Sequence, residues 1–443
     1  MTSPFSSLSA EFVRRPLSRR HGRIAAVRPG SIDVSGLGPA VRVGDRLAFP
    51  DGAPIGEVIA LDSTTARAMT YHDCTGIGAR QEVILEPEPE FRPCAAWQGR
   101  IVDAFGEPLD GRPLPQGDAA RTIRAAPPPA AARRPMGRRM RTGVAALDTM
   151  LPLVRGQRIG VFAGSGVGKS TLLASIARAA EADRVVLALV GERGRELRHF
   201  TDSVLGAEGL ARSVVVAATS DQSPLVKRRA AWSATAVAEH FRDQGEHVLL
   251  IVDSLTRMAE AHREVALTAG EPASLRAFPP STGGLIAALA ERAGPGAGDQ
   301  GDITAVFSVL VAGSDMEEPV ADMSRGVLDG HVVLDRAIAE RGRFPAIDVR
   351  RSVSRSLPGA ASERENTLIA LARRVLGTYE TAAPMVQAGL YTPGADPDLD
   401  AALRIWPKLD ALFARTGLPR IEESFQALGQ ALDLEPSQGP SDG

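Results

Sequence analysis

The chain has 443 residues, of which 44% are hydrophobic, so its apolar content allows more than one buried core. Its 51 lysine and arginine residues nearly balance its 53 aspartate and glutamate residues, which gives a formal net charge of −2 at pH 7. A net charge this close to zero provides no general attraction to nucleic acid or to acidic membranes. The only cysteines are Cys74 and Cys94, which excludes a disulfide scaffold and favours an intracellular protein.

The sequence predicts neither a membrane span nor a secretory leader. Its longest apolar run, residues 303–313, is much shorter than the roughly 18 residues that a membrane-spanning helix needs. The first residues lack the basic stretch followed by an apolar stretch that marks a signal peptide. We therefore expect a cytoplasmic protein.

Residues 1–21 mix basic and apolar side chains, a composition that has two interpretations. The segment could form an amphipathic helix that docks on a partner or on a membrane surface. However, Pro4 and Pro16 weaken a helix, and chain termini are commonly poorly ordered. We predict a flexible N-terminal segment.

The next region, residues 22–95, contains short β-like runs separated by glycine, proline and aspartate turns. Short strands at this spacing predict a small β-barrel domain. Its basic residues are not interleaved with aromatic side chains, which argues against a barrel that binds nucleic acid. The expected strands cover residues 23–27, 31–34, 46–49, 56–61 and 67–71.

In residues 96–361, uniformly apolar runs alternate with helical stretches, which predicts a parallel sheet covered on both faces and an α/β domain. Within this region, residues 119–141 contain three consecutive prolines and several arginines, and we interpret them as a solvated linker in preference to a nucleic-acid-binding patch. The expected strands cover residues 158–162, 185–190, 214–218, 248–252 and 304–311.

After residue 361 the apolar side chains recur at helical spacing, as in Leu368, Leu371, Ala372 and Val375. This pattern predicts a C-terminal helical domain over residues 362–434. Residues 435–443 have the composition of a disordered tail.

A phosphate-binding loop follows the expected strand at residues 158–162. The segment reads Ala163-Gly164-Ser165-Gly166-Val167-Gly168-Lys169-Ser170-Thr171 and leads into a helical stretch, the setting that this motif requires. Its small residues let backbone N–H groups converge on phosphate oxygens at a helix N-terminus. Lys169 would contact the β- and γ-phosphates, and the Ser170 hydroxyl would bind Mg²⁺. The chain has 48 arginines and only three lysines, yet lysine stands here, where a compact charge suits the loop better than a planar guanidinium.

Two carboxylates end apolar strands of the expected sheet. Asp253 occupies a position from which P-loop enzymes hold Mg²⁺, directly or through water. Glu192 would face the same crevice, where it could polarise the water that attacks the γ-phosphorus. Spacing alone leaves a second interpretation open, in which Glu192 forms a surface ion pair with Arg193 or Arg195.

An arginine-rich segment, residues 345–355, contains Arg350, Arg351 and Arg355. An arginine here could reach the γ-phosphate bound by a neighbouring subunit and neutralise the charge that develops there, an effect worth ~10³–10⁵ in rate. The residues alone do not decide among the three.

Together these motifs resemble the type III secretion and flagellar protein-export ATPases, relatives of the catalytic subunit of rotary ATP synthases. The resemblance extends from about residue 22 to residue 432 and depends on six segments, residues 99–111, 142–148, 162–173, 191–196, 328–334 and 344–355. It implies an α/β fold with a RecA-like P-loop ATPase core, an N-terminal small β-barrel and a C-terminal helical domain.

The resemblance also implies roles for individual residues. Glu192 takes the position of the catalytic glutamate, Arg193 that of a γ-phosphate contact, and Arg355 that of an arginine finger. Phe344 takes the position of the aromatic residue that stacks on adenine. A noncatalytic ring subunit is expected to lack the glutamate, so Glu192 indicates an active chain, and a homo-hexamer would need no second kind of subunit.

The implied function is ATP hydrolysis with Mg²⁺ that energises export of flagellar proteins through a type III secretion apparatus. The implied partners are a stator-type regulatory protein at the N-terminal segment, export chaperones and substrates, and the export gate at the inner membrane, where the cytoplasmic ring would associate peripherally. No nucleic-acid partner is expected. Residues 270–284 depart from the family's pattern, because the usual Gly-Tyr before Pro279 and Pro280 is missing.

Three other functions are compatible with parts of this pattern. The ATPase of a virulence injectisome would carry the same motifs, so it stays open. A rotary ATP synthase catalytic subunit is disfavoured, because the C-terminal region lacks that protein's acidic Asp-Glu-Leu-Ser-type loop. A ring-shaped RNA translocase is disfavoured by the near-neutral charge and the aromatic-poor N-terminal region.

Overall fold

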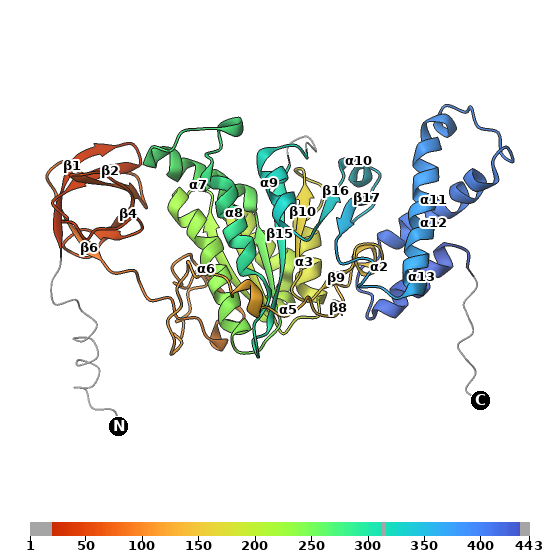
Figure 1. Cartoon of the computed structure of the whole chain (residues 1–443), viewed down its shortest axis with the longest axis horizontal. Helices are drawn as coiled ribbons and strands as arrows, with labels where there is room; N and C mark the ends of the chain where they lie inside the picture. Colours follow the sequence, from red (N-terminus) through yellow and green to blue (C-terminus); the bar gives the residue numbers. More distant parts are fainter. Residues whose placement is uncertain (1–19, 312–315, 435–443) are drawn as a thin grey trace, which may run out of the picture. The chain divides into compact units, whose positions relative to one another are not determined.

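The chain is divided into two compact units. The computed structural model describes residues 20–311 and 316–434 (Figure 1). As far as they are described, the first unit holds Met1–Glu90, Gln222–Val226 and Glu260–Pro280, and the second holds Phe91–Asp221, Lys227–Ala259 and Ser281–Gly443. Most of the predicted N-terminal segment and the whole predicted tail lie outside the described residues, and residue 21 already begins a strand.

A closed β-barrel forms most of the first unit. Its strands are β1 (His21–Arg28), β2 (Ser31–Ser35), β3 (Arg46–Ala48), β4 (Pro54–Leu61), β5 (Thr65–Thr70) and β6 (Glu82–Glu86). They pair antiparallel in the order β1-β2-β5-β4-β3-β6. Ile24, Ile32, Leu47 and Val58 are almost completely buried in one apolar cluster. The predicted barrel is confirmed, although the sequence pattern missed β6, whose three apolar residues stand between two glutamates.

The second unit is built on a nine-stranded sheet. Along the sheet the strands are β17 (Ile347–Ser354), β16 (Gly330–Leu334), β10 (Arg158–Ala163), β15 (Asp302–Leu310), β13 (Val248–Asp253), β11 (Arg184–Glu192), β12 (Ser213–Thr219) and β7 (Arg100–Val102), with β14 (Gly294–Pro295) paired to β15. The strands from β16 to β7 are parallel, and β17 and β14 are antiparallel to their neighbours. Every residue of β13 is buried, as expected for a strand covered on both faces. The predicted α/β class is confirmed.

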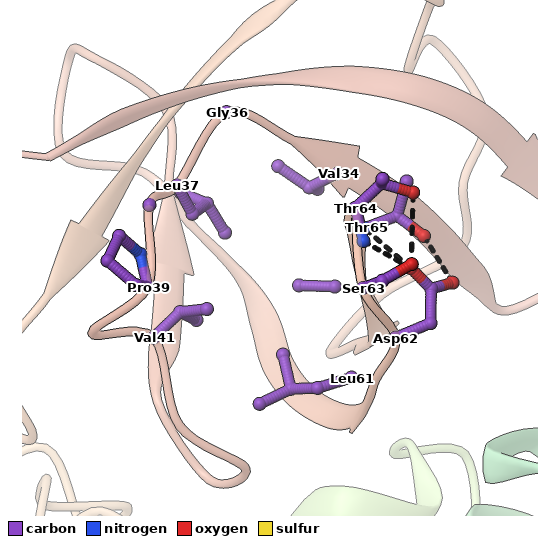
Figure 2. A pocket seen from close by; sticks show the side chains of 12 residues that line it. Val34, Gly36, Leu37, Pro39, Val41, Leu61, Asp62, Ser63, Thr64 and Thr65 are labelled. Carbon is purple, nitrogen blue, oxygen red and sulfur yellow. Dashed lines mark hydrogen bonds between the residues drawn. The ribbon is translucent and has the colours of Figure 1, made fainter.

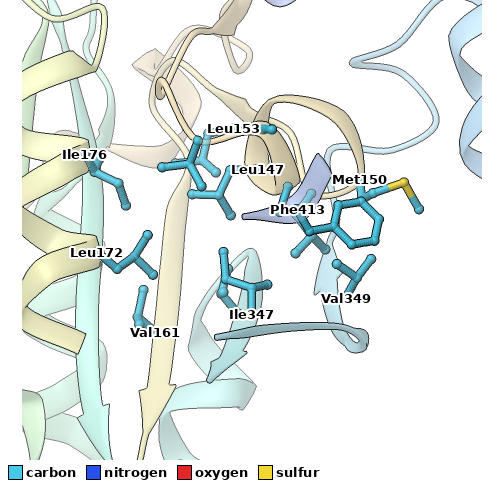
Figure 3. Close-up of a cluster of buried hydrophobic side chains, with 14 of the residues drawn as sticks. Leu147, Met150, Leu153, Val161, Leu172, Ile176, Ile347, Val349 and Phe413 are labelled. Atoms are coloured by element: carbon cyan, nitrogen blue, oxygen red, sulfur yellow. The ribbon is translucent and has the colours of Figure 1, made fainter. Parts of the chain in front are cut away.

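Helices connect the strands of this sheet. They are α2 (Ala145–Thr149), α3 (Lys169–Ala179), α4 (Gly194–His199), α5 (Gly206–Ala211), α6 (Pro224–Arg242), α7 (Leu255–Ala269), α8 (Ser281–Arg292), α9 (Pro319–Val327) and α10 (Arg336–Glu340). Leu172 and Ile176 of α3 belong to the same buried cluster as Val161 of β10 (Figure 3). In the described part of the chain, no helix combines the length and the apolar character that crossing a bilayer requires.

The C-terminal part of the second unit is helical, as predicted. Its helices are α11 (Glu363–Gln387), α12 (Pro397–Phe413) and α13 (Ile421–Ala431). Ser362 and Glu365 form a capping box that satisfies backbone N–H groups at the start of α11. Phe413 of α12 lies beside Ile347 and Val349 of β17 in the buried cluster (Figure 3). The core of the sheet and that of the helices are therefore continuous.

The arginines of the predicted linker, residues 119–141, contact other parts of the second unit. Arg134 pairs with Asp302 at 2.7 Å. The Arg139 side chain is only 10% exposed and lies 3.5 Å from Glu365. Most residues of this stretch are exposed, as in a solvated linker, but its arginines also form ion pairs with the rest of the second unit.

Candidate active site

The phosphate-binding loop lies at the carboxyl end of β10, between β15 and β16 in the sheet. The strand ends at Ala163 and α3 begins at Lys169, which is the predicted strand–loop–helix arrangement. Gly166 and Gly168 have φ angles of 78° and 87°, a left-handed backbone that glycine adopts at little cost. At such a loop the backbone N–H groups and the positive end of the helix dipole favour a bound phosphate.

One side chain of the loop is buried, and several others are exposed to solvent. Val167 is 2% exposed and belongs to the buried cluster of the second unit. Ser165, Ser170 and Thr171 are exposed. The Ser170 hydroxyl, on the first turn of α3, is thus accessible to a ligand beside Lys169.

Lys169 brings the two predicted carboxylates together. Its Nζ donates to Oδ1 of Asp253 and lies 3.9 Å from Oε1 of Glu192. The Asp253 side chain is 3% exposed, and it also accepts a hydrogen bond of 2.6 Å from Oγ of Ser308. Asp253 ends β13 and Glu192 ends the adjacent strand β11, so the carboxyl ends of parallel strands place both groups at the loop.

Both the backbone and the charges around Glu192 are unusual. Gly191, with a φ of 72°, precedes Glu192 at a register shift between β11 and β12. Burial raises the pKa of the Glu192 carboxyl above its ordinary value, and the negative charge of Asp253 adds to this rise, while Lys169 opposes it. A carboxylate that is partly buried and has a raised pKa suits a group that must accept a proton near neutral pH.

Arg193 lies outside this cluster. Its side chain is 66% exposed and pairs with Glu196 at 3.2 Å, within the first turn of α4. The surface ion pair that the sequence left open thus belongs to Arg193 and Glu196, whereas Glu192 lies next to Lys169.

Phe344 borders the phosphate-binding loop. A carbon of its ring lies 3.1 Å from the place where a side chain at Gly168 would begin, so a larger residue there would press on the ring. The residue is 47% exposed. An aromatic ring with an accessible surface beside the loop can stack on a nucleotide base.

Arg355 lies at the opposite end of the sheet from the loop of its own chain. Because β17 is antiparallel to β16, its first residue, Ile347, is level with Ala163, whereas its last residue, Ser354, is level with the start of β10. At roughly 3.3 Å per residue, Arg355 is displaced from the loop by about five residues, or about 17 Å. An arginine side chain does not span that distance.

The three candidate arginines differ in their partners. Arg350 pairs with Glu380, and Arg351 lies 3.5 Å from Asp335. Arg355 is exposed and donates to the carbonyl oxygen of Arg325, 3.4 Å away, in the last turn of α9. Within the described residues, Arg355 is the member of the three that has no carboxylate partner.

The sequence prediction missed two residues of the cluster. Ser308 holds Asp253, and its signal was a hydroxyl inside the otherwise apolar run of residues 305–310. Arg257 lies on the first turn of α7, and its side-chain carbons are close to Gly191, just before Glu192. Its position four residues after Asp253, one helical turn from the end of the strand, was the available signal.

The oxygen atoms at the loop suit Mg²⁺. The Ser170 hydroxyl and the Asp253 carboxylate are hard oxygen donors of the kind that Mg²⁺ prefers, and the metal commonly uses one or two such groups together with substrate phosphates. Across residues 20–311 and 316–434, no group of three or more His, Cys, Asp or Glu side chains could hold a metal ion. Substrate phosphate oxygens and water would supply the remaining ligands.

The barrel has a separate pocket of about 460 Å³ (Figure 2). Leu37, Val41 and Leu61 supply apolar side chains to its lining. At its edge, hydrogen bonds from Thr64 and Thr65 lower the pKa of Asp62 to about 2. None of the predicted site residues lines this pocket.

Comparisons with known proteins agree with this geometry. The family described as "ATP synthase alpha/beta family, nucleotide-binding domain" matches residues 143–354, and "T3SS EscN ATPase C-terminal domain" matches residues 361–428. The "Flagellum-specific ATP synthase" of Caulobacter vibrioides is 44% identical over 94% of this chain and 96% of its own length. The chain is a member of the flagellar and type III secretion ATPase family.

Other members of this ATPase family are similarly close. The "SPI-2 type 3 secretion system ATPase" of Salmonella typhimurium is 42% identical over 84% of this chain and 85% of its own length. The assembled ATPase EscN of enteropathogenic E. coli has a TM-score of 0.86 at 35% identity, over 93% of this chain and all of EscN. EscN in complex with its central stalk EscO gives 0.84 at 36% identity, with the same coverage. The family resemblance predicted from the motifs is confirmed, and the chain is an ATPase.

Proposed function

We propose that this ATPase energises export of flagellar proteins through a type III secretion apparatus, as a homo-hexameric ring. The observation that carries the proposal is the convergence of Lys169, Asp253 and Glu192 beside the phosphate-binding loop. It equips a single chain with the groups that ATP hydrolysis needs. The similarity to flagellum-specific relatives along nearly the whole chain supports the choice of cargo.

In this proposal each group of the site has one task. Backbone N–H groups of residues 164–168 and the ammonium group of Lys169 bind the phosphates. Glu192, as a carboxylate, orients the attacking water and accepts its proton. Mg²⁺, held by Ser170 and Asp253, would neutralise charge on the β- and γ-phosphates. Phe344 stacks on the adenine ring, and Arg193, exposed beside Glu192, reaches toward the γ-phosphate.

The position of Arg355 supports a site shared between subunits. It lies too far along β17 to reach the loop of its own chain, yet it is exposed and lacks a carboxylate partner among the described residues. In a ring of identical subunits every interface has the same two surfaces, so each Arg355 can complete the site of a neighbour. We therefore propose that Arg355 acts as the arginine finger.

The proposed partners follow from the organisation of the chain and from its relatives. A stator-type regulatory protein would bind residues 1–21, and export chaperones and substrates would contact the C-terminal helices. The ring would lie in the cytoplasm, peripherally associated with the export gate at the inner membrane, and would bind no nucleic acid. EscN binds a central stalk, EscO, and we propose that a stalk contacts this ring as well, near the divergent residues 270–284.

The cargo can be tested by replacing a relative in cells. We expect the wild-type chain to restore secretion of filament protein in Caulobacter vibrioides that lacks its flagellum-specific ATP synthase, and the Lys169→Ala variant to restore none. The matched arm expresses the chain in Salmonella typhimurium lacking the SPI-2 ATPase. Restoration in the second strain only would contradict the flagellar assignment and favour the injectisome.

Glu192→Gln should bind ATP but hydrolyse it ~10²–10⁴-fold more slowly, because an amide cannot accept the proton of the attacking water. Since the pKa of Glu192 is raised and its carboxylate is the active form, wild-type kcat should fall with decreasing pH at values above those where an ordinary glutamate titrates. The residual kcat of Glu192→Gln should not show this fall at low pH (the acid limb of the pH profile). Steady-state kinetics between pH 5 and 9 measure both effects.

Glu196→Gln is the matched control for this experiment. Glu196 is a neighbouring carboxylate, and its negative charge contributes to the raised pKa of Glu192. Its replacement should leave kcat near the wild-type value and move the acid limb toward lower pH. Near-normal turnover by Glu192→Gln would transfer the water-orienting role to another residue.

A further inference from the structure

The loop that carries Phe344 lies between the phosphate-binding loop and helix α12. It covers residues 341–346 and joins α10 to β17. On one side the Phe344 ring borders Gly168. Next to it, Nη2 of Arg336, the first residue of α10, lies 3.4 Å from the carbonyl oxygen of Ser165. Any shift of residues 341–346 therefore moves the ring relative to the phosphate site.

Arg343 fixes this loop from within. Its side chain is 8% exposed, and its two terminal nitrogens donate to the carbonyl oxygens of Pro345, at 3.1 Å, and Ile347, at 2.9 Å. A guanidinium is planar, with donors in fixed directions. Its position thus sets the backbone course directly after Phe344.

The charge that compensates Arg343 comes from the helical region. Oδ1 of Asp410 on α12 lies 3.0 Å from Nε of Arg343 but off the N–H direction, so the contact is an ion pair without a hydrogen bond. Burial lowers the pKa of Arg343, and Asp410 opposes this by favouring the charged form. Removing the partner of a buried charge is strongly unfavourable, so Asp410 keeps Arg343 docked against α12.

Helix α12 is firmly attached at this place. Phe413 is 2% exposed and lies beside Ile347, where β17 begins (Figure 3). One turn from Asp410, Trp406 stacks on Tyr379 of α11 with ring centres 4.3 Å apart, and the Arg341 guanidinium lies 5.3 Å from the Trp406 ring centre. Movement of α12 is thus transmitted to both ends of residues 341–346.

We propose that the Asp410–Arg343 ion pair positions Phe344, so that the C-terminal helices set the affinity of the site for adenine nucleotides. The inference depends on the proposed contact between Phe344 and the base. With Asp410 in place, Arg343 holds the loop and Phe344 borders Gly168. A ligand that displaces α12 weakens nucleotide binding, and by linkage a bound nucleotide opposes that displacement.

Asp410→Asn in the full chain tests the inference, because asparagine keeps the shape of the side chain and removes its charge. We expect the Kd for ADP, measured by titration calorimetry, to rise about three- to tenfold. The KM for ATP should rise with it, while kcat at saturating ATP changes by less than about twofold, since no group at the phosphates is altered. Asp410→Glu should recover most of the affinity.

The matched control is Asp433→Asn. Asp433 pairs with Lys408 and Arg404, which lie on an exposed part of α12. The φ of Asp433, 58°, is a conformation that asparagine tolerates. This variant should bind ADP as the wild type does. Thermal unfolding of every variant shows whether the fold is retained.

A double-mutant cycle distinguishes positioning from general destabilisation. Phe344→Ala should weaken ADP binding, and Phe344→Ala with Asp410→Asn should be no weaker, because Asp410 acts through the ring. An unchanged Kd in Asp410→Asn, or additive losses in the double variant, would overturn the inference and leave the base contact standing. If Phe344→Ala binds ADP with wild-type affinity, both the inference and the proposed contact between Phe344 and the base are wrong.

Trp406 provides a measurement that leaves the ion pair intact. Binding of ADP to the wild-type chain should change its tryptophan fluorescence, and Trp406→Phe should abolish that change. If ADP binds without any change in Trp406 emission, α12 does not sense the nucleotide and the inference is overturned, even where Asp410→Asn fails to fold.

Discussion

Arg355→Ala is expected to lower kcat by ~10³–10⁵-fold, the range found when an arginine finger is removed. ADP affinity should change little, because ADP lacks the γ-phosphate that Arg355 is proposed to contact in the neighbouring subunit's site. The Arg355 guanidinium contacts a carbonyl oxygen at the end of α9, so the fold does not depend on it. ATP turnover at saturating substrate and ADP titration of the same preparation measure the two effects.

Arg351→Ala is the matched control on the same strand. Arg351 lies 3.5 Å from Asp335 within its own chain, and exposed pairs of this kind contribute little. We expect turnover within about threefold of the wild type, because the γ-phosphate loses no contact. A loss of the size expected for Arg355→Ala would assign the finger to Arg351 instead.

Lys169→Ala should reduce ATP hydrolysis to background, a loss of at least ~10²–10³-fold, because the ammonium group beside Asp253 and Glu192 is removed. The change also leaves Asp253, with a side chain only 3% exposed, without its cation. Weaker binding of ATP is therefore expected together with lost turnover. A phosphate-release assay and circular dichroism would show an inactive protein that is still folded.

The rarity of lysine in this chain supplies the control. Lys408→Ala removes an exposed lysine that pairs with Asp433 and should leave hydrolysis unchanged. Turnover retained by Lys169→Ala would contradict the assignment of the phosphate site.

The phosphate-binding loop and the carboxylates around it could be predicted because their signals are local. The glycines, Lys169 and Ser170 follow one another in the sequence, and Asp253 and Glu192 each end a run of apolar residues. Carboxyl ends of parallel strands meet at one edge of a sheet, so the strand pattern also predicted that these groups converge. In the structure, the predicted site residues Asp253 and Glu192 both lie beside Lys169.

The remaining features depend on pairing between distant segments. Nothing near Arg355 in the sequence indicates that β17 is antiparallel, yet this direction places Arg355 away from the loop. The β6 strand forms because β1 and β3 pair with it, which its short apolar run does not indicate. The ion pair between Arg343 and Asp410 joins the loop before β17 to helix α12, two segments that no local pattern connects.

Mixing Arg355→Ala with Lys169→Ala tests most directly whether the site is shared between subunits. Each variant is expected to be inactive alone. Rings assembled from equal amounts of both contain interfaces where an intact loop meets an intact Arg355, about one quarter of all interfaces if the subunits mix at random. We predict that the mixture regains up to about that fraction of the wild-type rate. Mixed rings, verified by mass measurement, that show no activity above the separate variants would contradict a finger supplied by the neighbouring subunit.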